Sequence, residues 1–162
     1  MRYSIIAFAL VVLMLFTALA NGQTPDPKKL KDQLTGDAKG QASANPQCKL
    51  FTQAEIAAYV GAQVGPGENA AGGLGCTWRN KNYSAYATVT IVAPNYFPEP
   101  SEMEGFKRLP NVGNRGWVAP DSGWTAAAIV RDVAVVVGVS GKAATEASAV
   151  GLLQEAIKRS KQ

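Results

Sequence analysis

Two cysteines, Cys48 and Cys76, are the residues of this chain best suited to chemistry. A pair of thiols can form a disulfide, take part in redox exchange or contribute to a metal site. The two are too far apart for a C-x-x-C redox motif, and the 162-residue chain has no histidine to complete a zinc site of the usual nitrogen and sulfur ligands. In an oxidising compartment, a disulfide is the simplest use of the pair.

The absence of histidine also removes the most common general base and every Ser-His or Cys-His pair. No G-x-S-x-G motif surrounds any serine. Residues 138–142 match a phosphate-binding loop only in part, because Val136 stands at the first glycine position and Ala143 follows the lysine. We interpret this stretch as a strand-to-helix connection. We therefore expect no catalytic residue, no metal site and no cofactor.

Three carboxylates, Glu99, Glu102 and Glu104, lie close together in the sequence. A close pair of carboxylates could act as general acid and base. Ser101 and Glu104 have capping-box spacing, which predicts a short helix through about Lys107. Acidic residues are favoured at a helix N-terminus by the helix dipole, so an enzyme based on these carboxylates is the less favoured interpretation.

The three tryptophans, Trp78, Trp117 and Trp124, have two readings. They could belong to the hydrophobic core, or they could form an aromatic binding surface, because tryptophan is enriched at interaction sites. The sequence leaves both readings open.

These side chains need a scaffold, and the first part of the chain does not belong to it. An apolar run over residues 5–16, followed by small residues, predicts a secretory signal peptide over residues 1–20 that is cleaved after Ala20. An uncleaved membrane anchor is the alternative, but the run is shorter than the roughly 20 apolar residues of a spanning helix. Asn21 stands where a lipoprotein has its cysteine. We therefore expect an exported protein, periplasmic or secreted, without a lipid anchor.

Residues 21–47 are rich in Pro, Gly, Lys, Asp, Gln and Ser, which predicts a flexible spacer. Residues 48–162 are then a single disulfide-stapled domain. The formal net charge of +4 suits solubility, or a weak attraction to an anionic membrane surface or polymer. No basic stripe with interleaved aromatic residues occurs, so we expect no nucleic-acid partner.

The domain should begin with a helix. Thr52 and Glu55 have capping-box spacing and Gly61 suits a left-handed position, which together predict a helix over residues 53–60. Residues 65–75 read as a glycine-rich loop, and Thr77 starts a strand.

The rest of the domain reads mostly as strands. Residues 83–92 alternate as a half-buried strand does, and residues 113–117 lead into another. Apolar runs at 124–130 and 133–139 predict a hairpin that turns at Arg131-Asp132, residues that do not favour a tight two-residue turn. Residues 142–161 are predicted to form the closing helix. This order predicts an α+β fold with one curved antiparallel sheet and helices packed on one face.

Two stretches have a distinctive spacing. One runs C-x-L-F-T-x-x-E-I from Cys48, followed by Gly61 and by G-C-x-W ending at Trp78, and the other is V-G-N-x-G-W at residues 112–117. Together they resemble an uncharacterised domain family of small exported proteins and lipoproteins of bacteria, common in actinobacteria. The chain departs from it in lacking a lipid-anchor cysteine and in having Asn114 where the family has Asp. The resemblance implies an envelope α+β domain with a disulfide, and it supplies no activity.

These observations favour a non-catalytic exported binding or accessory module for a small ligand or an unknown envelope protein. One alternative is an inhibitor or accessory subunit that docks on an envelope protein through residues 65–75. A less favoured alternative is a carboxylate-based envelope enzyme. An exposed apolar patch near that loop or the tryptophans would favour docking, and a pocket with two close carboxylates would favour the enzyme.

Overall fold

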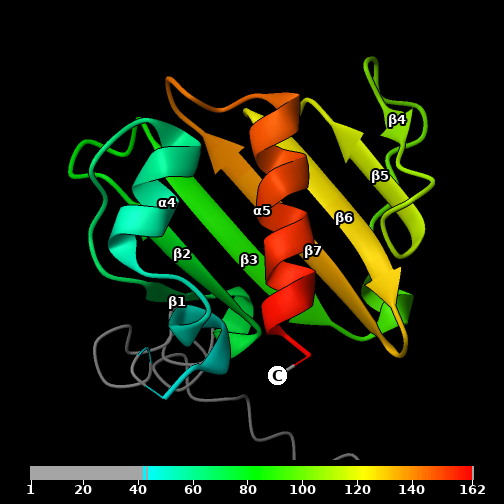
Figure 1. Ribbon diagram of the computed structural model, residues 1–162, viewed down its shortest axis with the longest axis horizontal. Helices are drawn as coiled ribbons and strands as arrows, with labels where there is room; N and C mark the ends of the chain where they lie inside the picture. Colours follow the sequence, from blue (N-terminus) through cyan, green and yellow to red (C-terminus); the bar gives the residue numbers. More distant parts are fainter. Residues whose placement is uncertain (1–41, 43, 162) are drawn as a thin grey trace, which may run out of the picture. The chain divides into compact units, whose positions relative to one another are not determined.

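A computed structural model describes residue 42 and residues 44–161. The predicted signal peptide at 1–20 and most of the predicted spacer at 21–47 lie outside the described residues. The described part contains one seven-stranded antiparallel sheet and two α-helices, so the fold is α+β as predicted. Both helices lie against the same face of the sheet (Figure 1).

The strands follow the spatial order β1-β2-β3-β7-β6-β5-β4, and the two shortest strands, β1 and β4, form its edges. The strands are β1 (Glu68–Ala70), β2 (Gly75–Arg79), β3 (Tyr86–Val92), β4 (Lys107–Arg108), β5 (Asn114–Ala119), β6 (Trp124–Val130) and β7 (Val133–Ser140). The helices are α4 (Gln53–Val60) and α5 (Glu146–Arg159), with short 3₁₀ turns η2 (Pro46–Lys49), η3 (Ala71–Gly73) and η4 (Pro94–Tyr96).

Helix α4 has the predicted bounds because its end signals are local. The Thr52 hydroxyl accepts a hydrogen bond of 3.3 Å from the Glu55 backbone N–H, and the Glu55 carboxylate accepts one of 2.8 Å from the Thr52 N–H. Gly61 ends the helix with φ at +69°, a left-handed conformation that glycine adopts at little cost. Ile56 and Val60 face the sheet and are buried.

Helix α5 begins at Glu146, four residues later than the predicted start at residue 142. The reason is a second capping box, in which the Thr145 hydroxyl accepts from the Ser148 N–H at 3.1 Å and the Ser148 hydroxyl accepts from the Thr145 N–H at 2.7 Å. Ala143 instead donates its N–H to the carbonyl of Val60, so the residues before the cap connect β7 to the end of α4. The buried face of α5 consists of Ala149, Leu152, Leu153 and Ala156.

The main core lies between the helices and the sheet. One row of paired residues crosses five strands on this face, and all of its side chains are buried: Cys76, Val89, Val137, Ala126 and Val118. Neighbouring residues on each strand point to the opposite face, because side chains alternate along a strand. Trp117 therefore lies on the far side of the sheet from Val118.

A smaller cluster covers part of that far face. Phe97, Met103 and Phe106, from the connection between β3 and β4, pack against Trp117. The indole of Trp117 donates to the Pro98 carbonyl at 2.9 Å. The helix predicted at residues 101–107 is absent from this described connection, which forms turns instead. The backbone of residues 107–108 pairs with β5 as strand β4, which removes the last residues of the predicted helix.

The β6–β7 hairpin turns at the predicted place but by a different turn. Val130 pairs with Val133, so Arg131 and Asp132 form a tight two-residue turn, contrary to the expectation from their side chains. Arg131 has φ at +57°, a conformation that side chains rarely adopt. Pairing along the whole length of both strands offsets this local cost.

Candidate functional site

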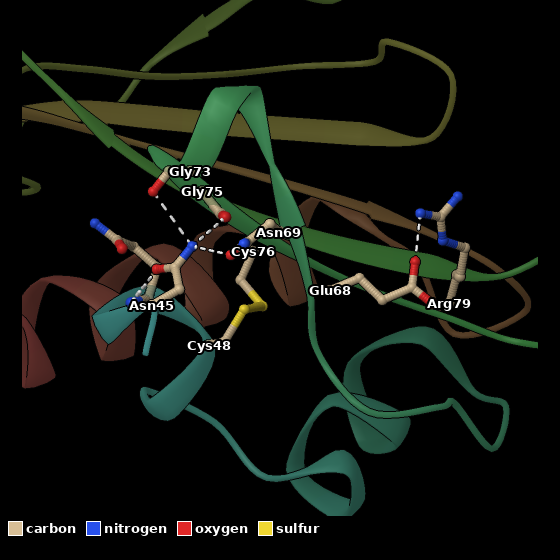
Figure 2. Close-up of a disulfide and its surroundings, with 9 residues drawn as sticks. Asn45, Cys48, Glu68, Asn69, Gly73, Gly75, Cys76 and Arg79 are labelled. Atoms are coloured by element: carbon tan, nitrogen blue, oxygen red, sulfur yellow. Dashed lines mark hydrogen bonds and ion pairs between the residues drawn. A yellow bond between two sulfur atoms is a disulfide. The ribbon is translucent and has the colours of Figure 1, made fainter. Parts of the chain in front are cut away.

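The predicted cysteine pair forms a disulfide. The Cα atoms of Cys48 and Cys76 lie 5.0 Å apart, and Cys76 is fully buried. The bond joins η2 to β2 (Figure 2). Cys76 belongs to the main core cluster, and Cys48 packs against it. Its role in the described structure is to fix the start of the domain to the sheet.

Asn45 strengthens the same junction and was missed by the sequence reasoning, which extended the spacer through residue 47. Its side-chain nitrogen donates to Asn69 Oδ1 at 2.7 Å, to the Gly75 carbonyl at 2.8 Å and to the Gly73 carbonyl at 3.3 Å (Figure 2). Its Oδ1 accepts from the Gln47 N–H at 2.9 Å. Contacts with the sheet therefore begin three residues before Cys48, at Asn45. The available signal in the sequence was an asparagine at the N-cap position before Pro46.

The glycine-rich stretch at residues 65–75 is only partly a loop. Residues 68–70 form β1, which pairs with β2 at the edge of the sheet, and residues 71–73 form η3. Its exposed residues are Pro66 and residues 71–74, and Leu74 has 53% of its surface exposed. The prediction of a continuous loop was wrong because the pairing with β2 stabilises a segment that has few strand-forming side chains.

The tryptophans do not form a shared surface. Trp78 is 1% exposed in the main core, and Trp117 is 2% exposed in the cluster on the opposite face. Trp124 is partly buried and packs against the main core. Trp78 and Trp117 are therefore core residues, so the three side chains do not make one exposed aromatic surface.

The carboxylate cluster does not form an acid–base pair in the described structure. Glu99 forms ion pairs with Arg108 and Arg115, and these hydrogen bonds, the one from Arg108 first, lower the pKa of its carboxyl group. Glu102 and Glu104 lie in exposed turns. An ionised carboxylate held by two guanidinium groups is a poor proton donor.

A groove of about 750 Å³ lies between the α4–β1 connection, residues 62–68, and the β2–β3 turn, residues 79–83. Two smaller hollows of about 270 and 470 Å³ share Ala62 with it and surround Gly61 at the C-terminal end of α4. The hollow part of this surface is thus centred where α4 ends. It lies at the opposite end of β2 from Asn45 (Figure 2).

Arg79 and Tyr83 line the groove and lie against each other. Arg79 donates from Nη2 to Glu68 Oε2 at 2.6 Å across the β1–β2 pair, and both side chains remain partly exposed (Figure 2). The Arg79 guanidinium lies 5.3 Å from the ring centroid of Tyr83. The Nε atom of Arg79 is buried and has no hydrogen-bond acceptor among the described residues. The described residues therefore accept hydrogen bonds from only some of the N–H donors of Arg79.

The turn that carries Tyr83 is held in place by Asn80. The Asn80 side chain accepts from the Ala85 N–H at 3.1 Å and donates to the Ser84 hydroxyl at 3.1 Å. The backbone carbonyl of Asn80 accepts from the Tyr83 N–H at 3.2 Å. Tyr83 has φ at +60° and 68% of its surface exposed. The wall of the groove is therefore pre-formed. Most of the Tyr83 side chain is exposed, although Arg79 lies over its ring.

The sequence reasoning missed this site because it placed Tyr83 at the start of a strand, whereas β3 begins at Tyr86. A run of polar residues from Arg79 to Ser84, between two apolar stretches, was the signal for an exposed turn. Among the described residues, no group of three His, Cys, Asp or Glu side chains could hold a metal ion.

A scan against protein-family models, a search of curated proteins and a search of solved structures each found no match. The resemblance to a family of exported bacterial domains therefore stays a prediction. None of the helices in the described part of the chain combines the length and apolarity needed to cross a membrane.

Proposed function

We propose that this chain is an exported, non-catalytic binding module that takes a small polar ligand in the groove between residues 62–68 and 79–83. The observation that carries the proposal is an exposed aromatic ring beside an arginine whose guanidinium is only partly engaged by Glu68, at the wall of a pre-formed hollow. The groove volume falls within the range of about 300–1,000 Å³ that is usual for ligand sites.

The chemistry of the lining supports binding rather than catalysis. Glu68 is the one carboxylate among the described residues that line the groove, and it is ion-paired with Arg79. The described lining residues include no second carboxylate, histidine or cysteine with which Glu68 could form an acid–base pair. The disulfide supports export, since such bonds persist mainly in oxidising compartments. Attraction of the basic chain to an anionic membrane surface stays a prediction.

The proposal can be tested by two-dimensional NMR of the purified, isotope-labelled protein against a collection of small polar molecules. Binding should shift the amide signals of Gln63, Asn80 and Tyr83, and Arg79→Gln should weaken it. Arg108→Gln is the matched control, because this arginine is also ion-paired but lies outside the groove. Shifts confined to other surfaces, or chemical conversion of the bound molecule, would contradict the proposal.

A second candidate function has one observation in its favour. Leu74 is exposed beside Gly72 and Gly73, and a Cβ atom at either glycine would have open space for 4 Å around it in the described structure. An inhibitor or accessory subunit that docks on an envelope protein through residues 65–75 would have this leucine in its interface. In pull-downs from the native envelope, Leu74→Ser should then release a partner that the native protein retains, while binding in the groove persists.

A further inference from the structure

We infer that the groove recognises a saccharide that carries a carboxylate, as a uronic acid does. This inference rests on the proposed function, because it names the ligand class of the same site. Three features of the groove support it: an aromatic ring in a strained position, an excess of cationic groups, and amide side chains beside them.

Tyr83 supplies the surface on which a sugar ring can pack. The C–H face of a pyranose is apolar while its hydroxyls point outward, so it fits against an aromatic ring whose polar end remains in water. Tyr83 is largely exposed, and its positive φ is strained for a bulky side chain. Glycine or asparagine would fit this conformation at lower cost. The exposed aromatic side chain of Tyr83 is therefore available to contact a ligand.

The charged groups of the groove favour an anionic ligand. Arg79 and Lys81 both line it, and only Glu68 among the described lining residues opposes them. Arg79 has several N–H donors, of which Glu68 engages Nη2 alone. Because a guanidinium is planar, it matches the two oxygens of a carboxylate better than a point charge does. The acidic group of the ligand is therefore expected at Arg79.

Amide side chains provide the remaining contacts that a sugar needs. Gln63 and Asn82 line the groove, and Asn82 uses its Oδ1 for Ser84, which leaves its Nδ2 to donate to a ligand. Amides both donate and accept, as hydroxyl groups require. A simple inorganic anion could use Arg79, Lys81 and the amide N–H donors but would gain nothing from the ring. The combination of groups therefore favours an acidic sugar over a free anion.

The test uses three probes with the purified protein: digalacturonic acid, its neutral counterpart galactobiose, and inorganic phosphate. Calorimetric titration should show that the acidic disaccharide binds about tenfold or more tightly than either of the other two, since it alone uses both the ring and the charge. NMR with the same probe should shift the signals of Asn82 and Tyr83. Arg79→Gln should reduce the affinity for digalacturonic acid to that for galactobiose.

Tyr83→Gly separates binding from folding. It relieves the positive φ, so the melting temperature should hold or rise while the affinity falls about tenfold or more. Tyr83→Asn, which also tolerates this conformation, gives a second variant if the first folds poorly. Tyr96→Gly is the matched control: this tyrosine is 72% exposed but does not line the groove, so the affinity should be unchanged.

Each contrary outcome has a distinct meaning. Phosphate binding as tightly as digalacturonic acid, or unchanged affinity in Tyr83→Gly, would overturn the saccharide inference and leave the proposed function in place. If neither disaccharide binds while other polar molecules still shift the groove signals, the saccharide inference is also overturned and the proposed function remains. Absence of groove shifts with every molecule tried would overturn both proposals together.

Discussion

Arg159, in the last turn of α5, donates a hydrogen bond of 2.7 Å to Glu55, in the first turn of α4, across 104 positions of the sequence. The same guanidinium donates to the Leu50 carbonyl at 2.6 Å and lies 4.5 Å from the ring centroid of Phe51. It also donates to Glu155 one turn earlier in its own helix. One side chain thus joins the two helices to the segment that precedes α4.

We expect Arg159→Leu to lower the free energy of unfolding by about 1–3 kcal/mol, because it leaves a partly buried carbonyl and a carboxylate without their donor. Lys158→Leu is the matched control: its side chain is 71% exposed, and the change should stay within about 0.5 kcal/mol. Urea denaturation measures both variants. Equal losses would show that Arg159 contributes no more than a surface charge.

The stability should depend on pH through Glu55. Hydrogen bonds, chiefly from Arg159 and then from Thr52, lower the pKa of this carboxyl group to about 2. Its value in the unfolded chain is about 4.3, so folding favours the ionised form. The stabilisation is then fully present above about pH 4.3 and is lost as the pH falls through about 2. Solvent screening reduces its size, because the side chain is 40% exposed.

Glu55→Gln removes that titrating group. The free energy of unfolding of this variant should therefore fall less steeply than that of the native protein between about pH 4.3 and pH 2. Denaturation curves recorded at several pH values measure the slope. Parallel slopes for the two proteins would mean that the carboxylate does not sense the guanidinium of Arg159.

The disulfide should account for a large part of the stability. The two cysteines are 28 positions apart, and the chain-entropy model gives about 3.6 kcal/mol for a loop of this length. Replacing both Cys48 and Cys76 with alanine should lower the free energy of unfolding by about that amount. Intact-mass measurement with a thiol-alkylating reagent should find no free thiol until reductant is added. Two alkylated cysteines without reductant would refute the pairing.

Two nearby glycines should respond differently to the same change. A Cβ atom at Gly67 would lie 2.6 Å from the Cys76 sulfur and 2.9 Å from Trp78 Nε1, so Gly67→Ala should destabilise the protein by about 1–3 kcal/mol. At Gly65 the nearest atom is 3.5 Å away, and Gly65→Ala should be nearly neutral. Thermal unfolding compares the two variants. A neutral Gly67→Ala would mean that β1 can move away from the disulfide.

Local signals explain which parts of the fold could be predicted. The bounds of α4 follow from Thr52, Glu55 and Gly61, all of which act within one helical turn. The β6–β7 turn follows from a polar pair between two apolar runs. Strand β1 and the packing of Trp117 could not be predicted, because each depends on partners far away in the sequence.

The groove itself could not be predicted either, because the two segments that form it are brought together by the tertiary structure. Its walls come from the α4–β1 connection and the β2–β3 turn, which are joined by a hydrogen bond of 2.9 Å from the Gly65 N–H to the Arg79 carbonyl. The register of the sheet also places Glu68 beside Arg79. A period-two pattern predicts a strand but not the strand that lies beside it, so neither juxtaposition is visible in the sequence.

The order of the strands has a consequence for aggregation. Strand β7 reads VAVVVGVS, a β-branched and nearly uncharged segment of the kind that forms amyloid when its edge is exposed. In the sheet it is paired on both sides, with β3 and β6, while the exposed edges are strands of three and two residues. Such short edges give a second chain few backbone groups to pair with. The folded chain is therefore protected against edge-to-edge polymerisation, and that hazard arises when β3 or β6 separates from β7.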